Sequence, residues 1–359
     1  MATDKGPVPG GDNGRGGISV LGQPGVLEGP GYLYRPGQVL VGAATVADHP
    51  GTIRQLREAG ATTDEELNER LRQAGLGVQA FQLPAIVNIP VLITQLRMRP
   101  AGGPVPDVSP NYVLAGEYNY EGGPFDEPHD ARPFPDDPCP EPHAPPLIAV
   151  LDTGYDPAIH HLHRGLAARI DHRPQDDEIA ILPDGYFAQE AGHGTFIDGI
   201  VMRLAPDLRI RHISVLSPAG VGDDVTVALG LAHEHAPVVN LSLGGYTHDN
   251  QPPTALQDAL GKLGDSVAIV AAAGNYGLQE PFWPAAFKGV VAVGALDTTS
   301  GQQRRASFSN YGHWVDIYAP GTRVRSTYLR GKWKLPTDPA PWHLGGWAHW
   351  SGTSFGPRR

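Results

Sequence analysis

Three short stretches of the chain carry side chains that could together perform nucleophilic catalysis. Asp152 lies in AVLDTGYDP after an apolar run, His193 lies between glycines in AGHGTFIDGIV, and Ser354 lies in SGTS. A serine hydroxyl becomes a good nucleophile only when an imidazole accepts its proton, and the imidazole needs a carboxylate to fix its tautomer. All three groups are present in the order Asp, His, Ser, which predicts acyl transfer.

A fourth side chain, Asn275 in AAAGN, suits the same chemistry. Acyl transfer puts negative charge on a carbonyl oxygen, and an amide aimed at that oxygen stabilises it. Each residue alone has a plain alternative. Asp152 could be a turn or capping aspartate, His193 is one of 15 histidines, and Asn275 could be a turn residue. The four together, in one order, favour catalysis.

Other candidate sites are weaker. HHLHRG (160–165) and HEHA (233–236) lack the H-E-x-x-H spacing that puts two metal ligands on one helical face, so we interpret both as solvated surface. GVGDDV lacks the third glycine of a dinucleotide loop, and no G-x-S-x-G elbow occurs. Cys139 has no identified base. The sequence therefore predicts no metal site and an idle thiol.

Composition narrows the class of protein. The 359 residues include 27 basic and 38 acidic side chains, a net charge of −11, which argues against a nucleic-acid partner. No apolar run reaches the ~18 residues of a membrane span, and a single cysteine gives no internal disulfide. The N-terminus lacks the apolar stretch of a secretory signal. We expect a cytoplasmic protein, with export by another route left open.

Proline divides the chain. Residues 1–30 are rich in Gly and Pro and are predicted to be disordered. Nine prolines lie between Pro124 and Pro146, so residues 121–146 are expected to form an extended linker that does not pair as a sheet. The linker separates a front domain at 31–120 from a rear domain at 147–359.

The two domains differ in pattern. In the rear domain, buried strand-like runs at 147–154, 209–216, 238–245, 267–275 and 290–296 alternate with helical patterns. This predicts an α/β fold with a parallel sheet and helices on both faces, whose functional groups gather at the carboxyl ends of strands. The front domain predicts a small α+β unit, with strands at 37–43, 78–83 and 109–117, a helix at 64–75 and another capped by Asn88.

From Leu147 onward the sequence resembles the subtilisin-like serine proteases, the subtilases or peptidase S8 family. LDTG, HGTFIDGIV, NLSLGG, AAAGN and SGTS occur in the family's order. The resemblance implies a triad of Asp152, His193 and Ser354, with Asn275 and the Ser354 backbone N–H as the oxyanion hole. It also implies that substrate binds along a set of small and apolar residues: Ser242, Leu243, Gly244, Gly245, Ala273 and Gly274. These residues suggest an open pocket for an apolar side chain.

The front domain resembles the family's inhibitory propeptide, mainly through SPNYV, and such a propeptide has a ferredoxin-like fold. The resemblance therefore implies a zymogen, with a peptide or protein substrate and its own propeptide as intramolecular inhibitor. It implies no cofactor; calcium stays open because no ligand set is identified.

The end of the chain departs from the family pattern. Only FGPRR follows Ser354, where family members continue into a buried helix. We therefore expect the C-terminal part of the peptidase domain to be missing. Two function classes follow: an endopeptidase made as a zymogen, or a catalytically inactive or truncated subtilase-like protein that binds peptides.

Overall fold

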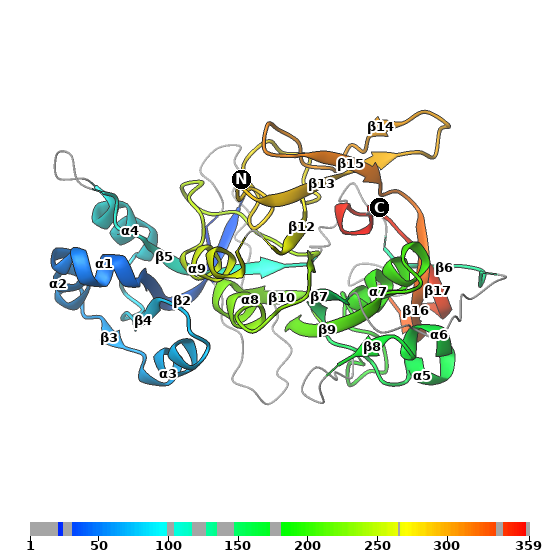
Figure 1. The fold of residues 1–359 in the computed structure, drawn as a ribbon, viewed down its shortest axis with the longest axis horizontal. Coiled ribbons are helices and arrows are strands. Elements are labelled where there is room, and N and C mark those ends of the chain that lie inside the picture. Colours follow the sequence, from blue (N-terminus) through cyan, green and yellow to red (C-terminus); the bar gives the residue numbers. More distant parts are fainter. Residues whose placement is uncertain are drawn as a thin grey trace. The chain divides into compact units, whose positions relative to one another are not determined.

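The computed structural model describes residues 21–23, 31–98, 104–116, 127–134, 147–172, 181–264, 266–334 and 340–356. The chain divides into two compact units, each coloured by sequence in Figure 1. The first contains Met1–Leu114, Asp223–His233 and Gly245–Gly264. The second contains Ala115–Gly222, Glu234–Gly244 and Asp265–Arg359. Two segments of the rear sequence domain thus belong to the same unit as the front domain.

The first unit is built on an antiparallel sheet in the order β5-β2-β4-β3, with β1 added to β2. Its strands are β1 (Leu21–Gln23), β2 (Tyr32–Gly42), β3 (Thr62–Thr63), β4 (Val78–Gln82) and β5 (Val108–Ala115). Its helices are α1 (Ala43–Asp48), α2 (Pro50–Glu58), α3 (Glu65–Gln73), α4 (Ile89–Arg97), α8 (Asp224–Leu231) and α9 (Thr254–Leu263). Helix α3 lies between β3 and β4, where a β-α-β-β-α-β arrangement has no helix.

Helices cover both faces of this sheet, because successive side chains along its strands point to opposite faces. Val39, Val41 and Phe81 share a buried cluster with residues of α2 and α4. Leu40 and Ala80 point to the opposite face, because successive side chains of a strand alternate, and both are buried. Helix α9 packs against β2 and β4. The sheet is therefore covered on both faces.

The helix starts follow local sequence signals. Asn88 accepts a hydrogen bond from the Val91 N–H, so the predicted cap of α4 is confirmed. Asp64 caps α3 in the same way through the Leu67 N–H. The helices α1 and α2 were not expected from the sequence.

The second unit contains a mostly parallel sheet in the order β14-β13-β12-β11-β7-β9-β8, with β15 beside β13. Its strands are β7 (Leu147–Thr153), β8 (Ile170–Asp171), β9 (Arg209–Leu216), β11 (Val238–Leu241), β12 (Ala268–Ala272), β13 (Val290–Asp297), β14 (Arg304–Arg305) and β15 (Ile317–Pro320). Pairing is parallel throughout except between β13 and β14. The five predicted strands are confirmed. Strands β11 and β12 end earlier than predicted, so the residues after them are irregular.

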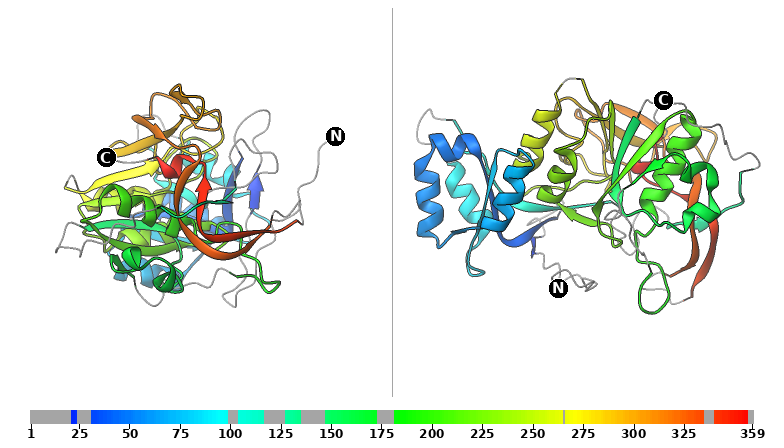
Figure 2. Two further views of the ribbon diagram at one scale, coloured as in Figure 1. Left: turned by 90° about the vertical axis from the view of Figure 1, so that its right-hand side faces the viewer. Right: turned by 60° about the horizontal axis from the view of Figure 1, so that its bottom comes forward.

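A second sheet, unexpected from the sequence, packs on helix α7 (His193–Leu204). It consists of β16 (Val324–Trp333), β17 (Trp342–Trp350) and β6 (His129–Asp130). Helix α7 contacts both β7 and β16. Figure 2 shows the ribbon from two further sides, with β16 and β17 in orange to red. Hydroxyls of Ser326 and Thr327 donate to carbonyls of α7. The remaining elements are β10 (Val221–Asp223), α5 (Ile159–Leu162) and α6 (Arg164–Ala167).

Three expectations about loops and surface were wrong. Residues 129–130 of the proline-rich linker do pair as a strand, because they carry no proline and their partners are Ala348 and His349 of β17. Residues 21–23 of the leader pair with β2. His163, assigned to solvated surface, is fully buried, and its Nε2 donates to the carbonyls of Gly346 and Tyr328. The rest of the leader, residues 117–120 of the front domain, and linker residues 121–126 and 135–146, which include Cys139, lie outside the described residues.

Within the described ranges, no helix combines the length and apolar character that crossing a bilayer requires.

Asp224 couples the first unit's stability to pH. Its buried carboxylate accepts hydrogen bonds from the N–H groups of Ala255 and Leu256 in the first turn of α9. Burial raises the pKa of Asp224 from 3.8 to about 7, although the two N–H groups oppose the change. Because the unfolded chain loses this proton near pH 4, the stabilisation is complete below that pH and is lost as the pH rises through about 7.

We therefore predict that the free energy of unfolding falls by a few kcal/mol between about pH 4 and pH 7. Asp224→Asn should flatten this slope, because the amide does not titrate. The exposed Asp48→Asn variant is the control and should keep the wild-type slope. Chemical denaturation at a series of pH values measures it, and an unchanged slope in Asp224→Asn would contradict the assignment.

Candidate active site

Strand β7 and helix α7 bring Asp152 and His193 together. His193 Nδ1 lies 2.7 Å from Asp152 Oδ1, and both side chains are fully buried. A carboxylate oxygen only accepts, so Nδ1 carries the proton and Nε2 is the basic nitrogen of the neutral ring. The Thr153 N–H donates to the same oxygen at 2.8 Å. The structure thus fixes the tautomer that a general base requires.

Glycines on either side of His193 allow this close approach. Gly192 caps α7 with a φ of 81°, in the left-handed region, and a Cβ there would lie 2.9 Å from Leu329 Cγ. A Cβ at Gly194 would lie 2.8 Å from the Thr153 carbonyl oxygen. The motif G-H-G therefore lets the start of α7 pack directly on the end of β7.

Ser354 lies in a 3₁₀ turn, Thr353–Phe355, that is tied to the segments after β11 and β12. Its Oγ donates to the Ser242 carbonyl at 3.4 Å. The Gly274 N–H donates to Thr353 Oγ1 at 3.0 Å. The turn is therefore held at the carboxyl edge of the sheet, where Asp152 also lies.

Asn275 follows β12 and is oriented by the same turn. The Thr353 N–H donates to its side-chain oxygen Oδ1 at 2.8 Å. Because a backbone N–H can only donate, this contact identifies Oδ1 and assigns the Nδ2 hydrogens to the other edge of the amide. An amide held this way presents a donor whose direction is fixed beforehand.

The segment before the linker pairs with the predicted substrate-binding residues. Ala115 and Gly244 exchange both backbone hydrogen bonds, at 2.9 and 2.8 Å. The Gly116 N–H donates to the Gly220 carbonyl at 3.0 Å. A Cβ at Gly116 would lie 3.8 Å from the His193 ring, so this backbone passes directly beside the imidazole. Ala115 and Gly116 therefore occupy the backbone edge, at Gly244, along which an extended peptide would pair.

The other predicted binding residues lie where their strands end. The side chains of Leu243 and Ala273 are buried in the core and offer only their backbone. Gly245 belongs to the first unit, where a Cβ would lie 2.8 Å from the Val113 carbonyl oxygen.

The Phe282 ring lies beside two of the glycines that suggested an open pocket. A Cβ at Gly244 would lie 2.3 Å from Phe282 Cε1, and one at Gly274 would lie 3.0 Å from Phe282 Cδ1. The ring is 4% exposed and also contacts Tyr276. An aromatic ring therefore lies against both of the glycines from which an open apolar pocket was expected.

Sequence reasoning missed the aromatic surroundings of His193. The rings of Trp350 and Phe355 each lie 5.4 Å from the imidazole, and both are fully buried. The available signal was their position beside SGTS, since residues flanking a nucleophile turn must pack against it.

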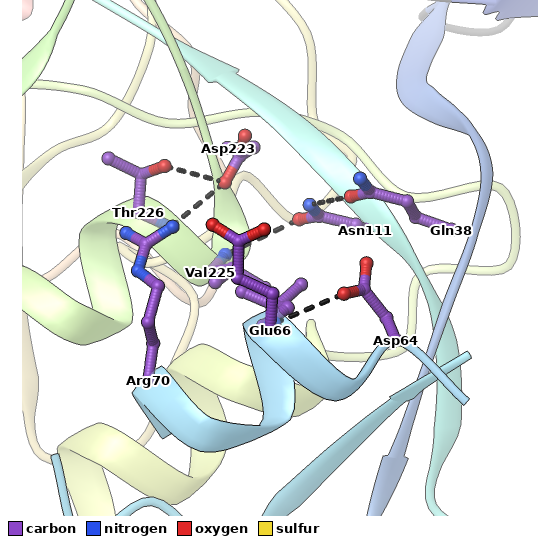
Figure 3. Close-up of a pocket in the computed structure, with 9 residues that line it drawn as sticks. Gln38, Asp64, Glu66, Arg70, Asn111, Asp223, Val225 and Thr226 are labelled. Carbon is purple, nitrogen blue, oxygen red and sulfur yellow. Dashed lines mark hydrogen bonds between the residues drawn. The ribbon is translucent and has the colours of Figure 1, made fainter. Parts of the chain in front are cut away.

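A hollow of about 230 Å³ lies within the first unit (Figure 3). Several of its polar groups already have structural partners. Asp223 binds Arg35 and caps α8 through Thr226, and Asn111 donates to Gln38. Among the residues with described positions, no group of three or more His, Cys, Asp or Glu could hold a metal ion. We derive no step through calcium.

Comparison with known proteins supplies the family. Residues 145–356, more than half of the chain, match the subtilase family. The chain belongs to this family. The mostly parallel sheet and helices of the second unit are the subtilisin-like α/β fold.

Several subtilases resemble the chain over different lengths. A thermophilic serine proteinase of Bacillus sp. (strain AK1) is 29% identical over 88% of this chain and 77% of that protein. A thermostable alkaline protease of Halalkalibacterium halodurans is 32% identical over 52% of this chain and 50% of that protein. Subtilisin Savinase of Lederbergia lenta is 34% identical over 50% of this chain and 65% of that protein. For the last two, the chain spans half to two thirds of the relative's length.

Solved structures give two further likenesses. A cold adapted subtilisin-like serine proteinase is 26% identical, with a TM-score of 0.42, over 59% of this chain and 70% of that one. A lanthipeptide protease is 22% identical, with a TM-score of 0.45, over 59% of this chain and 69% of that one.

Proposed function

We propose that this subtilase is a serine endopeptidase that hydrolyses peptide bonds through Asp152, His193 and Ser354. The observation that carries the proposal is the fully buried 2.7 Å contact between His193 Nδ1 and Asp152 Oδ1. Burying an ionisable pair such as this one costs free energy, even when its two groups are hydrogen-bonded to each other. Its position beside the Ser354 turn supports a catalytic use.

The proposed reaction begins with a rotation of Ser354. Its Oγ turns from the Ser242 carbonyl toward His193 Nε2 and attacks the substrate carbonyl as the imidazole takes its proton. The oxyanion is stabilised by Asn275 Nδ2 and the Ser354 N–H. His193 then protonates the leaving amine, and water releases the acyl group from Ser354 by the same steps in reverse order.

We also propose that the protein is made as a zymogen with its own front segment as inhibitor. The pairing of Ala115 with Gly244, and the passage of Gly116 beside His193, support this. A peptide substrate would use the same backbone groups by β-strand addition. Substrate and front segment therefore compete for one edge.

A peptide-binding protein without catalysis is the second candidate. The observation that favours it is the hydrogen bond from Ser354 Oγ to the Ser242 carbonyl, which directs the hydroxyl away from nucleophilic attack. The pairing edge at Gly244 would serve binding alone. The two candidates differ in whether Ser354 reacts.

We predict that Ser354→Ala abolishes peptide hydrolysis and labelling by a fluorophosphonate, because the Ser354 hydroxyl is the proposed nucleophile that forms the acyl-enzyme. His193→Ala should be about as damaging, since triad members act as a unit. Ser351→Ala is the matched control: its Oγ accepts from the Arg323 N–H, and labelling should persist. Wild-type protein that neither hydrolyses peptides nor labels would favour the binding protein.

We predict that the active protein cleaves itself C-terminal to Gly116, between about Glu117 and Pro146. The reason is that Gly116 passes His193, so the bonds that follow it are the first to reach Ser354. Intact-mass spectrometry should find two fragments in wild type and one full-length chain in Ser354→Ala. A wild-type chain that stays whole while hydrolysing added peptides would contradict self-processing.

We predict a preference for Gly or Ala immediately before the scissile bond, because Phe282 fills the space beside Gly244 and Gly274. Phe282→Ala should raise kcat/KM for Leu or Phe at this position by about 10-fold or more, the usual effect of a side-chain pocket. Phe134→Ala, which removes a ring that packs between Arg203 and Arg325, is the control and should leave the preference unchanged. Equal preferences in wild type and Phe282→Ala would refute the role.

A further inference from the structure

Behind the Asp152–His193 pair lies a second buried histidine and carboxylate, which the proposed reaction does not use. His212 comes from β9, and Asp198 comes from α7, on the same helix as His193. His212 Nδ1 lies 2.8 Å from Asp198 Oδ2, and His212 Nε2 lies 2.7 Å from the Thr153 carbonyl oxygen. Both side chains are completely buried. Burying an ionisable pair costs desolvation free energy, and a function served at this position would account for that cost.

The hydrogen-bond partners determine the proton count of His212. The Thr153 carbonyl can only accept, so Nε2–H donates to it. Nδ1 faces a carboxylate, so the ring donates there as well and is an imidazolium. Burial by itself lowers the pKa of His212, but the Asp198 charge and hydrogen bond, the Thr153 carbonyl and Asp152 raise it to about 9. Burial raises the pKa of Asp198, although the charge and hydrogen bond of His212 oppose that change. We expect the imidazolium–carboxylate form at neutral pH, and Nε2–H donates to the Thr153 carbonyl in either form.

The sheet is irregular at the point where His212 binds. Asp152 pairs with Ser214, but Thr153 pairs with Leu216, so the β7–β9 ladder shifts between the two. A shift of this kind leaves backbone groups without ladder partners. The His212 side chain meets the Thr153 carbonyl there.

Thr153 connects this pair to the proposed triad. Its N–H donates to Asp152 Oδ1, the oxygen that also contacts His193. Its Oγ1 accepts from the Gly194 N–H at 3.0 Å, in the first turn of α7. Holding the Thr153 carbonyl therefore restrains the residue whose N–H orients Asp152 and whose hydroxyl binds the start of the helix that carries His193.

We propose that His212 and Asp198 are positioning residues for the triad, acting through Thr153. The inference rests on the proposed protease function, because positioning is defined by what the triad does. The groups that face His212 are Asp152 from β7, Asp198 from α7 and the Tyr155 ring at 5.8 Å, which itself contacts His172.

A purely structural pair would behave differently. Replacing a buried ion pair by apolar residues of similar volume often leaves stability unchanged or higher. The double variant H212L/D198L should therefore fold, with a melting temperature close to that of wild type. It lacks a donor for the Thr153 carbonyl. If the pair only fills space, kcat stays the same; if it positions Asp152, kcat falls.

The kinetic test compares four proteins with one peptide substrate. We expect H212L/D198L to lose about 10-fold or more in kcat, with KM within about twofold, because a small misplacement of catalytic groups is costly in rate. Asp198→Asn keeps a hydrogen bond to Nδ1 and the Nε2 donor, so it should recover most of the rate. His163→Gln alters another buried histidine that donates to backbone carbonyls and should lower stability but not kcat. A folded double variant with wild-type kcat would overturn the proposal.

A second measurement does not depend on activity. In Ser354→Ala protein, ¹⁵N NMR of the histidine rings should show His212 with both nitrogens protonated from pH 6 to pH 8. In Asp198→Asn/Ser354→Ala the same ring should be neutral at pH 8. A His212 ring whose Nε2 carries no proton in the first protein overturns the proposal even if the protease function holds, because the Thr153 carbonyl would then have no donor. A different result would separate the two ideas. If His212 is an imidazolium in the Ser354→Ala protein but wild-type protein neither hydrolyses peptides nor labels, the proposed function has failed instead.

Discussion

The buried hydrogen bond between Asp152 and His193 is the contact on which the rest of the second unit depends. Both groups have lost water, and removing either partner would leave the other without compensation in a region of low dielectric constant. The arrangement survives because Thr153 donates a further hydrogen bond and because the Trp350 and Phe355 rings enclose the imidazole. The surrounding elements therefore have to hold Asp152 and His193 in one orientation.

Two structural features, the parallel sheet and the β16–β17 hairpin, hold these residues in place. The parallel sheet brings Asp152, Ser242 and Asn275 to one edge, since each lies at or just after the end of a strand. The hairpin of β16 and β17 supports the opposite side of α7 and ends at Trp350, just before the turn that carries Ser354. The hairpin thus contributes to the site through packing rather than chemistry.

The sequence allowed much of the sheet and the four candidate site residues to be predicted, because continuous β-branched runs and the order of short motifs are local signals. The hairpin was missed because its strands mix glycine, charged and tryptophan residues, a pattern without clear alternation. His163 was misjudged and Phe282 was overlooked for another reason. Their burial depends on Gly346 and Gly244, partners far away in the sequence that no local pattern identifies.

The most direct test of the account is a crystal structure of the protein after reaction with a peptidyl phosphonate. The proposed mechanism requires a covalent bond from Ser354 Oγ to phosphorus, and a phosphonyl oxygen within hydrogen-bond distance of Asn275 Nδ2. It also predicts that the His193–Asp152 contact is retained and that the inhibitor backbone pairs with Gly244. A reagent bound to another residue, or to Ser354 with Asn275 turned away from the phosphonyl oxygen, would contradict it.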